Sequence, residues 1–82
     1  MSAELTNAKI RDWWNAGLTL GASHVIIAYD SNPAFREYSQ HYVSPGEDLE
    51  EVLVELRQIH EIIRTLDYSL DLDEQMADEI AA

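Results

Sequence analysis

The clearest pattern in the chain lies between Glu47 and Leu70, whose sequence is EDLEEVLVELRQIHEIIRTLDYSL. Apolar residues recur in this stretch at alternating spacings of three and four residues. We call them the apolar seam; they are Leu49, Val52, Leu56, Ile59, Ile63, Leu66 and Leu70. Such spacing is typical of the buried face of an amphipathic helix. Because Ser44-Pro45 just before it offers a hydroxyl cap and an early proline, we predict a helix from about Glu47 to Leu66.

The apolar seam has two interpretations. It can pack against the rest of its own chain, as an amphipathic helix does on a small sheet. It can equally pack against the same helix of a second copy, as in a coiled coil. The sequence favours neither, so a homodimer stays open.

The N-terminal part predicts a helix followed by a hairpin. Apolar residues at helical spacing indicate a helix over about residues 3–16, which Gly17 would end in the left-handed conformation. The β-branched, apolar run His24–Asp30 indicates a well-covered strand at about 23–30. Alternation between Tyr38 and Val43 indicates a second strand at 38–43 that pairs with the first.

The C-terminal part predicts one more helix. Asp71 followed by Glu74 resembles a capping box before a helix at about 72–80. The whole chain of 82 residues is then a single small α+β domain, ordered α-β-β-α-α, with a small antiparallel sheet packed on the long amphipathic helix. Because a two-stranded hairpin is marginal in water, we expect Leu18-Thr19-Leu20 to add a third strand, or a sheet edge to pair with another copy.

The composition excludes several classes of function. With 16 acidic and 5 basic residues the net charge is −11, which disfavours direct binding to nucleic acid or to anionic membranes. No apolar run approaches the roughly 20 residues that cross a bilayer. The start Met1-Ser2-Ala3-Glu4 lacks the basic and apolar regions of a secretory signal, and there is no Cys. We therefore expect a cytoplasmic protein without membrane contact.

The negative charge is concentrated in the second half of the chain. Residues up to Gly46 hold 4 acids and 3 bases, whereas Glu47–Ala82 hold 12 acids and 2 bases. Part of this charge is expected at a helix N-terminus, where the helix dipole favours carboxylates by about 0.3–1 kcal/mol each. The remaining acids form either a plain solvated face or a surface for a basic partner.

Residues that could carry chemistry are few. His24, His41 and His60 lie on three different elements and could converge with Asp30 on a metal, but none has the local spacing of a zinc site. Ser31 beside Asp30 is the one nucleophilic arrangement, and it lacks the Gly-x-Ser-x-Gly elbow and a helix N-terminus for an oxyanion. We therefore expect no metal, no cofactor and no enzymatic activity.

The stretch from His24 to Asp48 resembles a group of short phage-encoded proteins of unknown function. The shared pattern, over about a third of the chain, is carried by His24, Val25-Ile26-Ile27, Asp30-Ser31, Phe35, Glu37, Tyr38, Tyr42-Val43 and Gly46-Glu47-Asp48. The chain departs from it by inserting Asn32-Pro33-Ala34 and by carrying Gln40-His41 where Pro-Val is usual. By size, acidity and order of elements alone, the chain is also similar to some anti-CRISPR inhibitors, which occupy the basic channel of a nuclease.

These observations predict a non-catalytic acidic interaction protein, of the phage-encoded, anti-defence type. It would mask a basic nucleic-acid-binding surface of a partner protein, with carboxylates in the place of phosphates. The residues expected at that interface are Glu47, Asp48, Glu50, Glu51, Glu55, Asp71, Asp73, Glu74, Asp78, Glu79 and, as an apolar anchor, Trp14. The alternative is a homo-oligomeric structural or assembly protein whose acidic surface serves only solubility.

Overall fold

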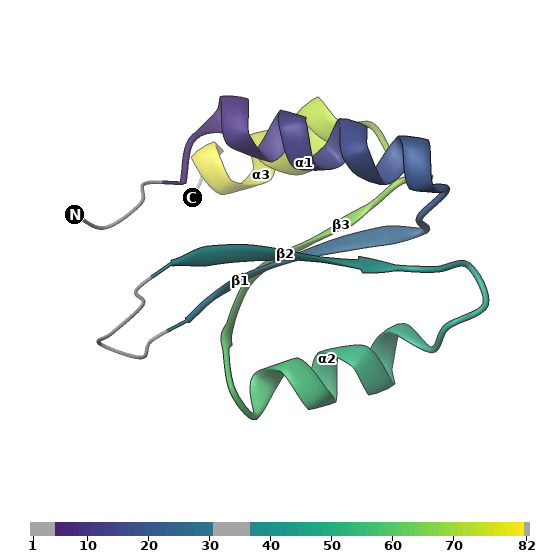
Figure 1. Ribbon diagram of the computed structural model, residues 1–82. Helices are drawn as coiled ribbons and strands as arrows, with labels where there is room; N and C mark the ends of the chain where they lie inside the picture. Colours follow the sequence, from purple (N-terminus) through teal and green to yellow (C-terminus); the bar gives the residue numbers. More distant parts are fainter. Residues whose placement is uncertain (1–4, 31–36, 82) are drawn as a thin grey trace.

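The computed structural model describes residues 5–30 and 37–81, with side chains up to residue 76 (Figure 1). Three helices and three strands alternate along this part of the chain. In order they are α1 (Asn7–Leu20), β1 (His24–Tyr29), β2 (Tyr38–Val43), α2 (Leu49–Arg57), β3 (Glu61–Asp67) and α3 (Leu72–Ala81). The predicted α+β class with a small antiparallel sheet is confirmed.

The sheet has the strand order β2-β1-β3 and both pairs are antiparallel. The central strand β1 is apolar because it is covered on both faces, and residues 25–28 are fully buried. Ile26 lies opposite His41 of β2 on one side and Thr65 of β3 on the other. The register with β3 shifts between Ile27 and Ala28, which leaves Ile63 as the extra residue of a β-bulge.

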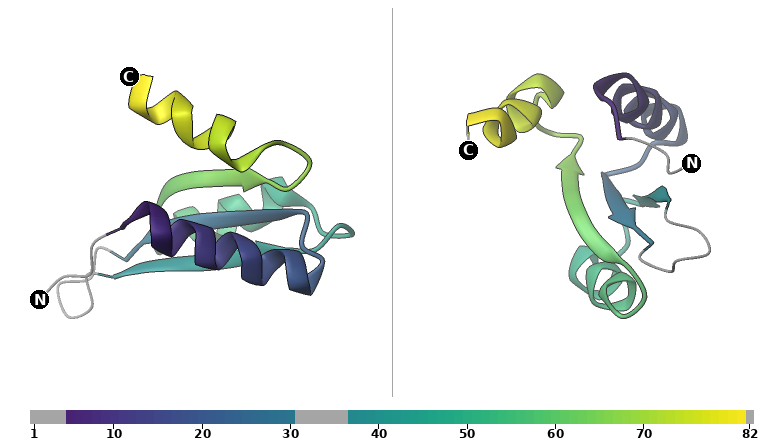
Figure 2. Two further views of the ribbon diagram at one scale, coloured as in Figure 1. Left: turned by 90° about the horizontal axis from the view of Figure 1, so that it is seen from above. Right: turned by 90° about the vertical axis from the view of Figure 1, so that its left-hand side faces the viewer.

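The helices form a layer on each face of the sheet. Figures 1 and 2 show α1 and α3 side by side over one face and α2 alone under the other. The upper core, between the sheet and α1 with α3, consists of Ile10, Trp14, Val25, Ile27, Leu66, Leu72 and Met76. The lower core, between the sheet and α2, consists of Ile26, Val43, Leu53 and Leu56. Alternate residues of β1 therefore face the two cores, as the pleat requires.

The prediction of a helix through Leu66 is wrong. α2 ends at Arg57, a turn follows in which the N–H groups of Ile59 and His60 both donate to the carbonyl of Leu56, and β3 begins at Glu61. β3 contains several β-branched residues, which suit a strand better than a helix. The missing third strand is thus β3 and not Leu18-Thr19-Leu20, which is the last turn of α1.

The apolar seam is divided between the two cores instead of forming one face. Its first part, on α2, packs in the lower core, whereas Ile63 and Leu66 pack in the upper core. Residues three apart point to opposite faces of a regular strand. The bulge at Ile63 places the Ile63 side chain on the same face as that of Leu66. Two residues three apart therefore share one face of this strand, as they would on a helix.

The first helix ends later than predicted because Gly17 does not end it. α1 runs to Leu20, and Gly21 adopts the left-handed conformation at its C-cap, with φ at 76°. Gly17 instead allows a close approach, since a Cβ there would lie 1.8 Å from the Tyr68 hydroxyl and 2.9 Å from a ring carbon of Tyr42. The Tyr68 hydroxyl donates to the carbonyl of Trp14, and the Tyr42 hydroxyl donates to the carbonyl of Trp13, both at 2.9 Å. These two hydrogen bonds bind α1 to the sheet.

Candidate functional site

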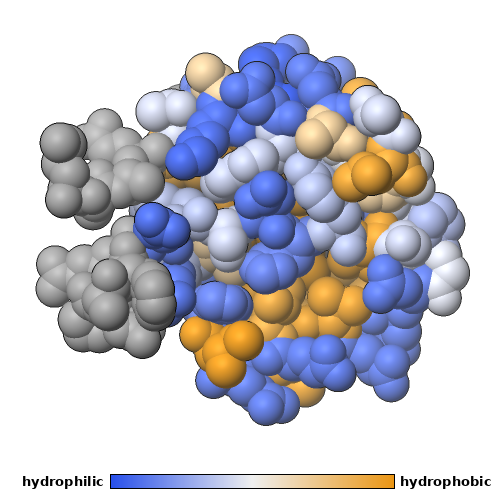
Figure 3. Space-filling view, viewed as in Figure 1, coloured by the Kyte–Doolittle hydropathy of each residue, from blue (hydrophilic) through white to orange (hydrophobic). Residues whose placement is uncertain are grey.

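The outward face of α2 carries a group of exposed carboxylates. Glu50, Glu51 and Glu55 surround Val54 and with it line a shallow groove of about 380 Å³. Val54 lies off the buried side of the helix and is 52% exposed. The groove therefore combines an apolar floor with an acidic rim. In Figure 3 hydrophilic side chains form most of the lower margin of the molecule, where α2 lies, with some hydrophobic side chains among them.

Two of the predicted interface residues at the start of α2 have structural roles. Asp48 is the N-cap, and its carboxylate accepts from the N–H of Glu50 at 3.0 Å. A carboxylate oxygen of Glu47 accepts from the N–H of Ser44 at 2.9 Å, which closes the turn before the helix. Both side chains are exposed, so they add charge beside the groove while they hold its backbone in place.

The predicted acidic residues of α3 do not join this groove. Asp71, Asp73 and Glu74 are exposed, but α3 lies on the opposite face of the sheet from α2 (Figure 2). Asp71 accepts from the N–H of Glu74 at the start of the helix, and Asp73 pairs with Arg11 of α1. Asp78 and Glu79 lie in α3 beyond the last described side chain. The structure thus divides the predicted acidic surface into two.

Trp14, which the sequence suggested as an apolar anchor, is buried. Trp14 is 8% exposed and belongs to the upper core, where its ring stacks on Tyr68 with centroids 4.0 Å apart. Its neighbour Trp13 is partly buried, with the ammonium of Lys9 over its ring at 5.5 Å. The apolar residue that stands among carboxylates is Val54, which sequence analysis did not select because it lies off the apolar seam.

A second pocket, of about 250 Å³, is lined by Asp30, Glu37, Ser39, His41 and His60. The rings of His41 and His60 are 5.6 Å apart, and His41 Nε2 lies 3.0 Å from the Ser39 hydroxyl. Burial, and then the neighbouring His60, lower the pKa of His41 below its usual 6.5. His60 Nδ1 is buried and has no hydrogen-bond partner among the described residues.

The sequence suggested that His24, His41 and His60 could converge with Asp30. In the structure His41, His60 and Asp30 line this histidine pocket, whereas His24 lies in a different cluster, with Ser23 and Asp67. Two imidazoles and two carboxylates could accept a proton or a small polar molecule. Within the described residues, no three His, Asp or Glu side chains are arranged to hold a metal ion.

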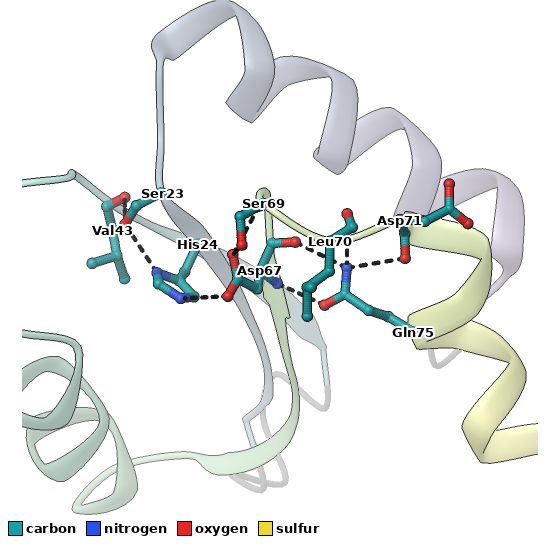
Figure 4. A network of polar contacts seen from close by, with 8 residues as sticks. All are labelled: Ser23, His24, Val43, Asp67, Ser69, Leu70, Asp71 and Gln75. Carbon is teal, nitrogen blue, oxygen red and sulfur yellow. Dashed lines mark hydrogen bonds and ion pairs between the residues drawn. The ribbon is translucent and has the colours of Figure 1, made fainter.

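A third polar cluster joins the ends of all three strands (Figure 4). Ser23 Oγ lies 2.9 Å from His24 Nδ1, and His24 Nε2 lies 3.6 Å from a carboxylate oxygen of Asp67. The order Ser–His–Asp is that of a hydrolase triad, but the Ser23 hydroxyl donates to the carbonyl of Val43 at 3.1 Å. Its hydrogen is therefore directed at a backbone oxygen and away from the imidazole.

Asp67 is the centre of this cluster. Hydrogen bonds from the N–H and hydroxyl of Ser69, opposed by burial and helped by His24, lower the pKa of the Asp67 carboxyl. Its backbone pairs with the side chain of Gln75 on α3: the Asp67 N–H donates to Oε1 at 2.7 Å, and Nε2 donates to the Asp67 carbonyl at 2.9 Å. The cluster therefore fastens β1, β3 and α3 to one another.

No protein-family model, curated protein or solved structure matches this chain significantly. None of the helices in the described part of the chain is long and apolar enough to span a membrane.

Proposed function

We propose that the protein is a non-catalytic acidic interaction protein whose α2 face binds a basic surface on a partner protein. The observation that supports this most is the groove on α2, in which Glu50, Glu51 and Glu55 surround the exposed Val54. An apolar contact within a charged rim is the usual construction of a protein interface. The carboxylates would meet Lys and Arg, and Val54 would enter an apolar position between them.

The partner surface that fits best is one that otherwise holds nucleic acid. Such surfaces are rich in Lys and Arg and accept anionic oxygens at regular intervals. Carboxylates on one helix face would replace phosphate oxygens there, and the net charge of −11 would speed the encounter through long-range attraction. Inhibition by masking, of the phage-encoded anti-defence kind that the sequence resemblance suggested, is the biological role we propose.

The division of the acidic residues between two faces narrows this proposal. Only the acids of α2 can contact one flat partner surface together with Val54. We therefore assign the interface to Glu50, Glu51, Val54 and Glu55, flanked by Glu47 and Asp48. The acids of α3 would contribute to steering and solubility and not to direct contact.

Photo-crosslinking from the groove tests the assignment. Benzoylphenylalanine at Val54 should crosslink to one partner in nuclease-treated host lysate, and the same group at the exposed Asn15 of α1 should not. Added duplex DNA should suppress the crosslink if the partner surface binds nucleic acid. Equal crosslinking from both positions, or a crosslink that DNA leaves unchanged, would refute the proposed role.

A further inference from the structure

The two outer strands, β2 and β3, differ in whether the backbone groups on their outer edges have hydrogen-bond partners. An open strand edge offers unpaired N–H and C=O groups to any other strand, so proteins block such edges. On β3, the Gln75 amide occupies both outward backbone groups of Asp67, and the bulge at Ile63 interrupts the edge further along. The C-terminal end of the β3 edge is therefore covered by a side chain of α3.

The register shows which groups of β2 face outward. Asp30 N–H donates to the Glu37 carbonyl at 2.9 Å, so Glu37 and every second residue after it bond to β1. The N–H and C=O groups of Tyr38, Gln40 and Tyr42 must then point away from β1. No hydrogen bond between described residues occupies these groups, and β2 has no other neighbour in the sheet.

The sequence of β2 also lacks the usual protection. Tyr38–Val43 reads YSQHYV, without Pro, Lys, Asp or Glu, and no bulge interrupts its pairing with β1. Figure 2 shows β2 on the side of α1, whereas α3 lies beyond β3. Among the described residues of the chain before Ser44, which supply α1, β1 and β2, the charged ones are Lys9, Arg11, Asp12, Asp30 and Glu37, so this side is nearly neutral.

We infer that the β2 edge binds the β2 edge of a second copy of this chain. With a two-fold axis at Gln40, each copy's Gln40 lies opposite the other, and Tyr38 lies opposite Tyr42 of the second copy. The three residues can then exchange all their outward N–H and C=O groups, and two three-stranded sheets become one continuous sheet. A near-neutral edge suits a second copy because charge repulsion between the two highly acidic chains is weakest there.

This inference is independent of the proposed function, and it specifies a register that substitutions can test. Gln40 is exposed, so its replacement should leave the fold intact, as circular dichroism would verify. Like charges directly opposite in a sheet oppose pairing, so Gln40→Lys and Gln40→Glu should each weaken the dimer by about fivefold. An equimolar mixture of the two variants should restore it. Sedimentation velocity over a concentration series measures all three.

Two controls separate the β2 edge from other surfaces. Gln58→Lys makes the same charge change at an exposed position after α2 and should leave the dimer unchanged. Gln40→Pro removes an outward N–H without removing a bond to β1, and should weaken the dimer by more than about tenfold. A monomeric wild-type protein, a dimer that Gln40→Pro leaves unchanged, or a mixture that fails to restore pairing would each overturn the inference.

Discussion

The side-chain amide of Gln75 pairs with the backbone of Asp67 as a neighbouring strand would, through hydrogen bonds of 2.7 and 2.9 Å. A helix residue thereby completes the sheet at one edge. The same amide lies within 3.3 Å of the carbonyl of Asp71, which ties the pairing to the start of α3. The same contact therefore covers the end of the β3 edge and attaches α3 to the sheet.

Gln75→Ala should both destabilise the protein and open the edge of β3. Loss of two hydrogen bonds, each worth about 0.5–1.5 kcal/mol, predicts a loss of about 1–3 kcal/mol in the free energy of unfolding. The opened edge should also produce species larger than those of the wild type. Urea unfolding and sedimentation velocity measure the two effects, and unchanged stability would show that the amide pairing is dispensable.

Gly17→Ala should destabilise the protein although alanine favours a helix. The new methyl group would lie 1.8 Å from the Tyr68 hydroxyl, so α1 must move away from the tyrosines that bind it. Overpacking of this kind costs about 1–3 kcal/mol, more than the roughly 0.5–1 kcal/mol gained in helix propensity. Gly46→Ala, which meets no atom within 4 Å, is the control and should be near neutral in urea unfolding. A stabilised Gly17→Ala protein would contradict the packing described.

Stability should fall on mild acidification because of His41. Its pKa is lowered in the folded protein, by burial and by His60, so protonation is harder in the folded than in the unfolded state. The unfolded chain then binds more protons, and the free energy of unfolding decreases as the pH falls below 6.5. His41→Gln should flatten this slope in urea unfolding between about pH 7 and pH 5. The lowered pKa of Asp67 affects the free energy of unfolding mainly below pH 3.8, outside this pH range.

Stability should also fall in strong alkali because of Tyr68. Burial, and then Tyr42, raise the pKa of Tyr68 from 10.0 to about 12. The unfolded chain therefore loses this proton first, and stability is lost as the pH rises above 10. Tyr68→Phe keeps the ring on Trp14 but removes the hydroxyl that donates to the Trp14 carbonyl. This substitution should lower the free energy of unfolding by about 0.5–1.5 kcal/mol near neutral pH. It should also reduce the loss of stability above pH 10 in urea unfolding. If that loss is as large as in the wild type, groups other than Tyr68 cause it.

The sequence predicted individual helices and strands better than it predicted which of them lie next to one another. The apolar run of β1 and the alternation of β2 indicated strands, and β2 spans the predicted residues 38–43. β3 was not predicted, because a bulge gave Ile63 and Leu66 the spacing of a helix face. The sequence raised a meeting of His41 with His60 and the pairing of a sheet edge as possibilities. The Gln75 pairing, and which edge stays open, follow only from the order of the strands in the sheet.

The candidate interface was predicted in part. Charge counting identified the acids of α2, but a linear pattern cannot show that α2 and α3 lie on opposite faces of the sheet. Trp14 was expected as an anchor because Trp is frequent at interfaces, but its ring is buried against Tyr68. Val54 was found only because its position in three dimensions places it among Glu50, Glu51 and Glu55.

The most direct test of the proposed function compares two variants that carry the same charge. One variant, E50Q/E51Q/E55Q, neutralises the groove on α2; the other, D12N/E61Q/E74Q, neutralises three exposed acids elsewhere. Each is used with the wild type to capture proteins from nuclease-treated host lysate, with washes at low and high salt. We predict that the wild type and the second variant retain one nucleic-acid-binding protein at low salt and release it at high salt, and that the first variant does not retain it. Equal capture by both variants, or capture that salt leaves unchanged, would contradict the assignment of a basic partner to the α2 face.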